Sequence, residues 1–151
     1  MAAPYNDLCS KVEQAFASII SALTLAGVRG TETVSVSVRT GLDDDEMLMP
    51  AVVCSAGDST EEAVRYTGNC RVKCMVHVYT QSGDESLTVH RARVATVQDA
   101  IWQDDIADQL SAAVGDFYVF DVDFVGPQQD PDGNSFHTAL EMVVVCCPSD
   151  L

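Results

Sequence analysis

The chain has 151 residues, of which 47% are hydrophobic, with 5 prolines and 9 glycines. A chain of this length buries about two thirds of its unfolded surface in one domain, and its composition argues against disorder and low complexity. We therefore expect a single globular domain over 1–151. The formal net charge of −15 repels phosphate and argues against a protein that wraps tightly around nucleic acid.

The acidic residues are unevenly spread. From 94 to 151 the chain carries eleven acidic residues and no Lys or Arg, and from 40 to 63 it carries seven and none. A surface of this sign suits a passage through which DNA moves without sticking. Simple solubility is the alternative interpretation.

The six cysteines lie mostly inside apolar runs such as AVVCSA and VVVCCP. Buried free thiols behave there as small hydrophobic side chains. The start MAAPYNDLCSK lacks the apolar segment of a signal peptide, so we expect synthesis in a reducing cytoplasm. No apolar run approaches the roughly 20 residues that span a bilayer, and we expect no membrane association.

The first predicted elements are a helix and a strand. Residues 6–26 form one apolar helical face, with Gly27 as a candidate C-cap. The face consists of Leu8, Val12, Phe16, Ile19, Ile20 and Leu23. TVSVSVR at 33–39 alternates strictly, with valine at every second position, which predicts one half-buried strand.

An acidic loop and a short strand follow. Residues 40–50 include four consecutive acids, which repel each other and resist burial, so we expect a solvated loop. These acids are Asp43, Asp44, Asp45 and Glu46. AVVCSAG at 51–57 predicts a short strand, and 58–64 a turn or edge segment.

The stretch CRVKCMVHVY at 70–79 fits either part of a metal site or a strand. On a strand, residues four apart lie about 13 Å from each other. Cys70 and Cys74 would then be too far apart to share one zinc ion, whose bond to sulfur is about 2.3 Å. His77 would also point away from Cys74, so we favour the strand and expect no metal.

A strand here has two unlike faces. One face, fit for the core, holds Cys70, Val72, Cys74, Val76 and Val78. The other holds Arg71, Lys73, Met75, His77 and Tyr79, and with Arg65 it carries three of the eight basic side chains. These basic residues either pair with acids across the sheet or dock on an acidic surface of an identical neighbour.

Two helices are expected next. Residues 86–103 place apolar side chains on or near one stripe, with Ser86 as N-cap. The stripe consists of Leu87, Val89, Val94, Val97 and Ile101. Residues 104–114 start a shorter helix with acids in its first turn. Trp102 either anchors this helix pair to the sheet or serves as an interface anchor.

The chain closes with a hairpin. FYVFDVDFV at 117–125 alternates Tyr118, Phe120, Val122 and Phe124 against Asp121 and Asp123. We expect a loop at 126–135 and a last strand at 136–147. Helices and strands are partly segregated, so we predict an α+β fold, with a mainly antiparallel sheet packed against an N-terminal helix and a central helix pair.

Catalytic and metal sites find little support in the sequence. His77, His90 and His137 fall in strand or helix patterns typical of structural side chains. Asp121 and Asp123 resemble a carboxylate pair, but the solvent side of an edge strand explains them equally. DPDGNS at 130–135 lacks the closing Glu of a calcium loop and suits a hairpin turn. We expect no catalytic residue and no cofactor.

The order of segments resembles the small tail terminator proteins of long-tailed bacteriophages, also called tail completion or minor tail proteins. The resemblance runs from about Lys11 to Pro148, through MPAVVCSAGDSTE, YTGNCRVKCMVHVYTQSGDES, HRARVATVQDAI and FYVFDVDFVGPQQDPDGNSFHTALEMVVVCCP. It implies a non-enzymatic virion part, made in the host cytoplasm. Such a part is a hexameric ring at the head-proximal end of the tail, which stops growth of the tail tube, joins the head connector or head-closure protein and lets genomic DNA pass through its lumen.

Three groups of site residues are expected on this basis. Arg65, Arg71, Lys73, His77 and Tyr79 would contact a subunit or partner. Asp43, Asp44, Asp45 and Glu46 would face the lumen or the neighbouring ring, and Gln128, Gln129, Asp130 and Asp132 would form a docking loop. The alternatives are another neck or tube virion protein, namely a head-closure or tail-tube subunit, or a small acidic cytoplasmic binding domain.

Overall fold

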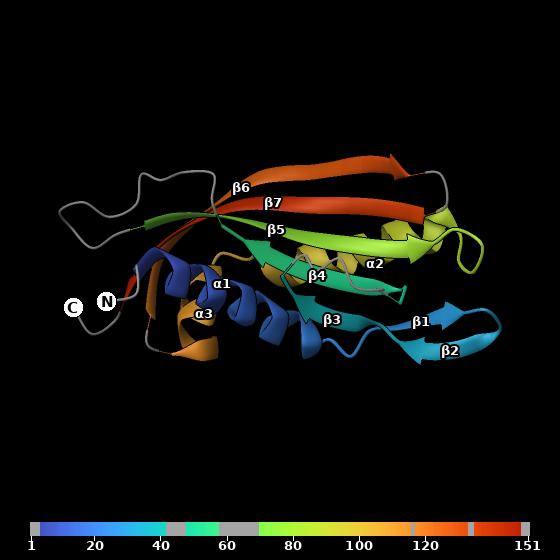
Figure 1. The fold of residues 1–151 in the computed structure, drawn as a ribbon, viewed down its shortest axis with the longest axis horizontal. Helices are drawn as coiled ribbons and strands as arrows, with labels where there is room; N and C mark the ends of the chain where they lie inside the picture. Colours follow the sequence, from blue (N-terminus) through green and yellow to red (C-terminus); the bar gives the residue numbers. More distant parts are fainter. Residues whose placement is uncertain (1–3, 42–47, 58–69, 116, 133–134, 149–151) are drawn as a thin grey trace.

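A five-stranded sheet covered by helices makes up most of the chain (Figure 1). The computed structural model describes residues 4–41, 48–57, 70–115, 117–132 and 135–148. The elements in chain order are α1 (Pro4–Ser21), β1 (Ala26–Arg29), β2 (Glu32–Ser35), β3 (Ser37–Thr40), β4 (Ala51–Ala56), β5 (Cys70–Gln81), α2 (Leu87–Ile101), α3 (Ile106–Val114), β6 (Phe117–Asp132) and β7 (Ser135–Pro148).

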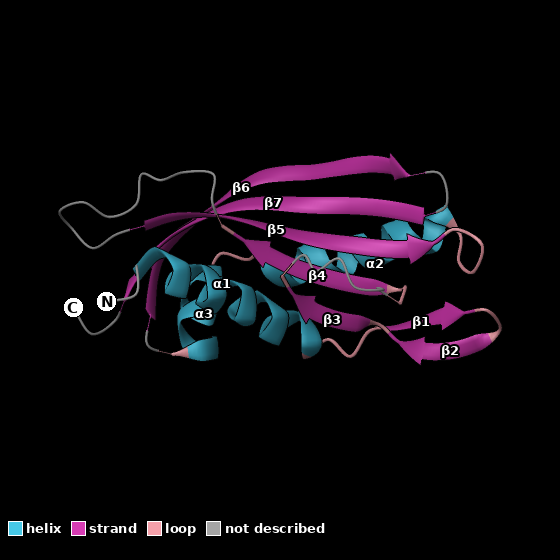
Figure 2. Cartoon of the chain, viewed as in Figure 1, coloured by secondary structure: helices cyan, strands magenta, loops and turns pink. Residues whose placement is uncertain are grey.

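The main sheet has the order β3-β4-β5-β7-β6, and β1 and β2 form a separate antiparallel ribbon. Only β3 and β4 pair in parallel among the described strands of the main sheet. The ribbon lies at one end of the molecule (Figures 1 and 2), where β1 contacts the Arg93 side chain of α2. The predicted α+β class with a mainly antiparallel sheet is confirmed.

The inner face of the sheet, defined as the face that contacts the helices, holds the core. Along β5, Val72, Cys74, Val76 and Val78 are fully buried, as the alternation predicted. Their partners across the ladder with β7 include Val144, Met142 and Leu140, which are also fully buried. CRVKCMVHVY is therefore a strand, and the prediction made from its spacing is confirmed.

The apolar face of α1 packs on this core. Leu8, Val12, Phe16 and Ile20 are buried, as predicted. The predicted end of the helix is wrong, because α1 stops at Ser21 and the chain turns at Thr24, whose φ is +49°.

Gly27 is therefore not a C-cap; it lies in β1. A Cβ atom there would stand 2.5 Å from the Pro50 ring and 2.8 Å from the Arg93 guanidinium. Glycine is required at this position because β1 passes so close to these two side chains.

The single strand predicted at 33–39 is two strands in two sheets. β2 pairs with β1, and β3 pairs with β4. Between them, Val36 is buried and its N–H donates to the Leu25 carbonyl at 2.9 Å. The alternation predicted an extended chain correctly, but it carried no signal for the change of partner at Val36.

The two later helices lie close to where they were predicted. Ser86 caps α2 by accepting a hydrogen bond from the Val89 N–H at 3.2 Å. Val94, Val97 and Ile101 are buried as expected. Leu87 and Val89 are exposed instead, because His90 and Arg93 occupy the centre of the buried face.

Trp102 lies at the C-cap of α2, and its ring centroid is 5.0 Å from that of Phe124 on β6. This contact is the anchor between the helix pair and the sheet that one of the two interpretations predicted.

The predicted alternation holds from Asp121 to Phe124, where Val122 and Phe124 stand opposite Val144 and Met142 of the inner face, but it fails on either side because β6 contains two bulges. The register with β7 shifts between Val119 and Asp121 and again between Phe124 and Gly126. A bulge adds one residue and exchanges the faces of the residues beyond it. Phe117, Val119 and Val122 are therefore the buried residues, whereas Tyr118 and Phe120 are exposed.

The loop predicted at 126–135 is also wrong, since β6 continues to Asp132. The four residues proposed for a docking loop pair with β7 in the register Gln128↔Ala139, Gln129↔Thr138, Asp130↔His137 and Asp132↔Ser135. β6 is an edge strand, which tolerates the prolines at 127 and 131 that made the segment look like a loop. The centre of the hairpin turn predicted at DPDGNS, residues 133–134, lies outside the described residues.

Replacing Phe16 by Ala tests the packing of α1. Phe16 is fully buried in the core, so Phe16→Ala should lower the free energy of unfolding by about 3–5 kcal/mol. Val89→Ala is the matched control: Val89 was predicted in the core but is 42% exposed, and its loss should change stability by less than about 0.5 kcal/mol. Urea unfolding measures both, and equal effects would contradict this packing.

Candidate subunit interface on the outer face of the sheet

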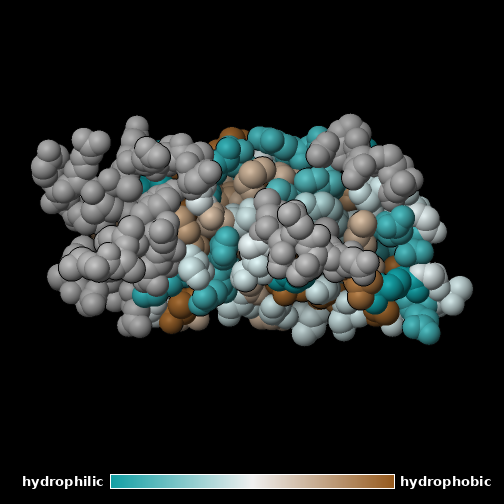
Figure 3. Space-filling view, viewed as in Figure 1, coloured by the Kyte–Doolittle hydropathy of each residue, from teal (hydrophilic) through white to brown (hydrophobic). Residues whose placement is uncertain are grey.

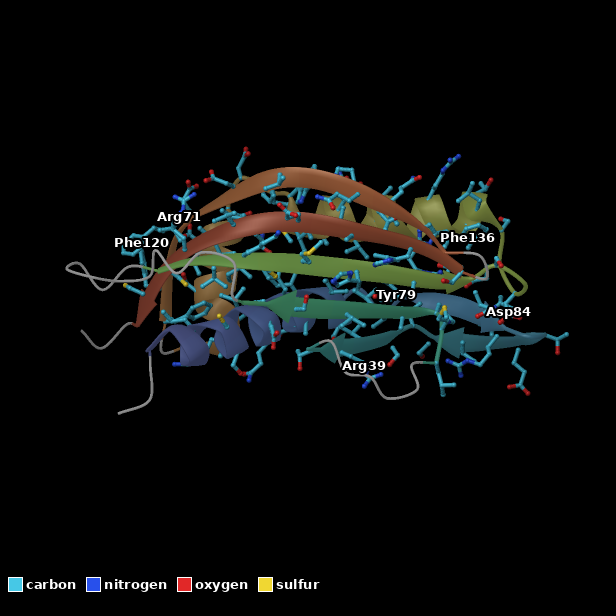
Figure 4. The ribbon with its side chains drawn as sticks, turned by 45° about the horizontal axis from the view of Figure 1, so that its top comes forward. Arg39, Arg71, Tyr79, Asp84, Phe120 and Phe136 are labelled. Atoms are coloured by element: carbon cyan, nitrogen blue, oxygen red, sulfur yellow. The ribbon has the colours of Figure 1, made fainter. Side chains whose placement is uncertain are left out.

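The outer face of the sheet, opposite the helices, carries four of the five residues predicted as a partner contact. The described members are Arg71, Lys73, His77 and Tyr79, and Met75 lies on the same face of β5. Figure 4 shows Arg71 and Tyr79 towards opposite ends of this strand. Arg65 lies outside the described residues, as do Asp43, Asp44, Asp45 and Glu46.

Lys73 pairs with an acid of its own sheet. Its Nζ lies 3.5 Å from a carboxylate oxygen of Glu141 on β7. The same carboxylate oxygen accepts a hydrogen bond from the Gln128 side chain at 3.2 Å. Glu141 thus contacts both Lys73 of the basic strand and Gln128 of the segment predicted to dock. Of the two roles predicted for the basic residues, pairing with an acid across the sheet is confirmed for Lys73.

Arg71 lies at the start of β5 with an exposed side chain. In register it stands opposite Val145, which in turn stands opposite Asp121 on β6. The residue before Asp121 is Phe120, and Figure 4 shows Arg71 and Phe120 near each other at this end of the sheet.

His77 is not available for docking, because it is only 6% exposed. Its Nδ1 lies 2.8 Å from the Nε2 of His137, and Tyr79 stacks on the His137 ring with centroids 4.3 Å apart. The alternation of the sequence placed His77 on the outer face correctly. It could not predict that His77 is buried there beside His137. His77 and His137 form a contact within one subunit.

Ser55, His77 and His137 superficially resemble a catalytic triad, with Ser55 as the nucleophile, His77 as the base and His137 as the orienting group. The Ser55 hydroxyl lies 3.4 Å from His77 Nε2, at the limit of a hydrogen bond. Burial and the neighbouring His137 lower the pKa of His77 to about 4. Such an imidazole is a weak base at neutral pH, and its orienting group is a second imidazole rather than a carboxylate. The geometry therefore favours a structural role.

A second polar cluster ties α2 to the inner face of the sheet. Glu85 and Arg93 form a buried ion pair at 2.7 Å, and Arg93 also donates to the Thr80 hydroxyl at 2.8 Å. His90 lies between two threonines, with Nδ1 2.8 Å from the Thr80 hydroxyl and Nε2 2.9 Å from the Thr138 hydroxyl.

Arg93 can only donate, so the Thr80 hydroxyl is the acceptor of that bond. A hydroxyl oxygen has two acceptor sites and one hydrogen, so Thr80 can either donate to His90 Nδ1 or accept from it. A neutral His90 ring makes one donating and one accepting bond with Thr80 and Thr138. Burial and the Arg93 charge lower the pKa of His90 to about 4, which favours the same neutral state.

The buried thiols of Cys54 and Cys74 are suited to packing rather than chemistry. Burial raises the pKa of Cys54 to about 12 and raises that of Cys74 well above its usual range. Thiolates are the reactive form, so these two side chains are inert at neutral pH. Within the described part of the chain, no group of three or more His, Cys, Asp or Glu side chains is arranged to hold a metal ion.

The sequence analysis missed an exposed apolar strip on β6. Tyr118, Phe120, Phe124 and Val125 are 48, 49, 39 and 56% exposed, and we call these four residues the β6 strip. Tyr118 stands in the outer-face row of the sheet, opposite Cys147, whereas Phe124 stands opposite Met142 on the inner face and packs on Trp102. The Tyr118 and Phe120 rings meet edge to face at 4.8 Å. Apolar (brown) surface is visible at the edge of the molecule where β6 runs (Figure 3). The signal was present, because FYVFDVDFV has large apolar residues at both odd and even positions.

A groove opens on the helix side of the molecule. It has a volume of about 490 Å³ and lies between the end of α1 and the second half of α2. Its walls are mostly apolar, and Asp99 supplies an acidic side chain. The lining residues are Ile19, Ala22, Leu23, Thr96, Asp99, Ala100, Gln103 and Gln109.

Comparison with protein-family models and with curated protein sequences gives no match in either case. Among the helices described, none combines the length and the apolar character needed to cross a membrane.

Low pH should destabilise the fold through His90. Its pKa is about 4 when folded and about 6.5 when unfolded, so the unfolded chain takes up a proton first as the pH falls. The contribution of neutral His90 to the free energy of unfolding is fully present above about pH 6.5. As the pH falls from about 6.5 to 4, this contribution should be lost, which lowers the free energy of unfolding by on the order of 3 kcal/mol.

Urea unfolding at several pH values checks this, with His90→Gln as the comparison. The carboxylates titrate in both proteins, so the difference between them isolates the histidine. We expect a smaller loss of stability at low pH in His90→Gln; an equal loss would contradict the neutral His90.

Proposed function

We propose that the chain is a structural, non-enzymatic virion protein that forms a hexameric ring at the head-proximal end of a phage tail. The ring ends polymerisation of the tail tube and offers the surface that the head connector or head-closure protein joins. The proposal rests on the resemblance of the segment order to tail terminators and on one observation of the fold, the exposed β6 strip.

The β6 strip supports an assembly role because of where it lies. It occupies an edge strand, and large apolar side chains gathered on a surface mark interaction sites. The chain carries a net charge of −15, which repels identical copies and opposes non-specific association. Association of such chains needs a specific apolar contact to outweigh this repulsion, and the strip supplies one.

The acidic surplus supports passage of DNA. In a ring, a lumen lined by carboxylates repels phosphate and lets the genome move without sticking. The two histidine clusters and the inert thiols are explained by packing, which is consistent with a part that performs no chemistry.

Imaging of phage particles that lack this protein tests the proposal. Without a terminator, tube growth has no stop, so we expect overlong tails without heads. Tails of normal length joined to heads would contradict the proposed function.

The purified protein separates the remaining alternatives. A single closed ring in negative stain agrees with a terminator, whereas stacked rings that grow into a tube would indicate a tube subunit. A monomer with a closed ligand pocket would indicate a small cytoplasmic binding domain. A head-closure protein is distinguished in intact particles instead, where its ring would lie on the head side of the joint.

A further inference from the structure

The groove between α1 and α2 lies where both helices end. Its α1 wall begins at Ile19, in the last turn of that helix, and its α2 wall includes Ala100, the residue before the last one of α2. The last carbonyl groups of a helix have no partner inside it, and they carry a partial negative charge. Neither helix has a basic residue in its last turn to offset that charge. Two uncompensated helix ends therefore border one groove.

Asp99 adds a full negative charge at the same place. It lies in the last turn of α2, where the helix dipole favours a cation and disfavours an acid. Among the described residues, its carboxylate has no hydrogen bond or ion pair. Its backbone carbonyl accepts a hydrogen bond from the neutral side-chain amide of Gln103 at 3.0 Å. A cation supplied from outside the chain would offset both Asp99 and the helix end.

The bases that the structure describes on the surrounding helices do not offset these charges. Lys11 and Arg91 lie more than one helical turn before the first lining residue of their helices, and Arg93 is buried in its ion pair with Glu85. Further exposed acids lie at the start of α3, where the dipole of that helix favours them. They are Asp104, Asp105 and Asp108. The helix dipoles thus explain these three acids but not Asp99.

The walls of the groove favour an apolar group beside the cation. They are formed mostly by apolar side chains, among them Ile19, Leu23 and Ala100. The volume of about 490 Å³ is in the range of pockets that hold ligands. A second copy of this chain is a poor occupant, because each copy carries a net charge of −15 and an acidic groove repels it.

We propose that the α1–α2 groove binds a segment of a different protein in which a large apolar side chain stands next to Lys or Arg. The apolar side chain lies against Leu23 and Ala100, and the cation faces Asp99 and the ends of the two helices. The contact goes beyond the proposed ring and does not depend on it.

A synthetic peptide tests the chemistry of the occupant. The probe is a capped peptide of sequence Arg-Leu-Phe-Arg-Leu-Phe-Arg, and isothermal titration calorimetry with the purified full-length protein measures its Kd. A peptide with glutamate in place of every arginine should bind at least about tenfold more weakly, because the groove repels it. A peptide with serine in place of every leucine and phenylalanine should also lose at least about tenfold, because it leaves the apolar walls uncovered.

Two pairs of variants test whether the peptide lies in the groove. Asp99→Asn should raise the Kd at least about threefold. Asp123→Asn removes the same charge from an exposed position on β6 outside the groove and should leave the Kd within about twofold. Ala22→Trp places a large side chain in the groove and should abolish binding, whereas Ala26→Trp, at an exposed alanine of β1, should bind like the parent. Circular dichroism checks that each variant is folded.

The inference is overturned if the glutamate peptide binds as tightly as the arginine peptide, if no peptide binds at millimolar concentration, or if Asp99→Asn loses no more affinity than Asp123→Asn. Self-association of the parent that Ala22→Trp abolishes would assign the groove to a second copy and would also reject the inference. None of these results bears on the tails of particles that lack the protein, so the proposed function stands or fails separately.

Discussion

The antiparallel pairing of β5 with β7 is the constraint on which the rest of the structure depends. It runs without a register shift from Cys70↔Cys146 to Gln81↔Ser135 and places both strands in the interior of the sheet. Side chains on a strand alternate, so a slip of one residue would move Val72, Val76 and their neighbours out of the core. The same register sets Lys73 near Glu141 and places Arg71 at the end of the sheet that carries the β6 strip.

The buried ion pair of Glu85 and Arg93 fixes the other end of this strand pair. Arg93 contacts Thr80 at the end of β5, and its second nitrogen lies 3.4 Å from the Ala26 carbonyl of β1. Removing one partner of a buried pair typically costs about 3–5 kcal/mol, because the remaining charge is left without compensation. The cluster therefore links the β1–β2 ribbon, α2 and the main sheet, and Gly27 gives it the space it needs.

The sequence predicted those elements whose burial is one-sided. The inward valines of β5, the apolar face of α1 and the Ser86 cap were all identified, because a single periodicity or a single local hydrogen bond determines each of them. The class of fold followed from the order of these elements.

Features that depend on partners distant in the chain were not predicted. The change of sheet at Val36 depends on Leu25 and Pro50, and the continuation of β6 past Gly126 depends on the length of β7. His77 was assigned to the correct face, but its burial requires knowledge of His137. The β6 strip was hidden by the alternation of FYVFDVDFV, which a bulge at Phe120 interrupts.

The central claim is that an acidic chain assembles through an apolar strip turned outward on an edge strand. A cryo-microscopy map of the intact phage particle tests it most directly. The account predicts a ring of copies at the head-proximal end of the tail, in which Tyr118 and Phe120 of each copy are covered by a neighbouring copy. A map in which these two side chains face solvent, or in which the chain is absent from the neck, would contradict it.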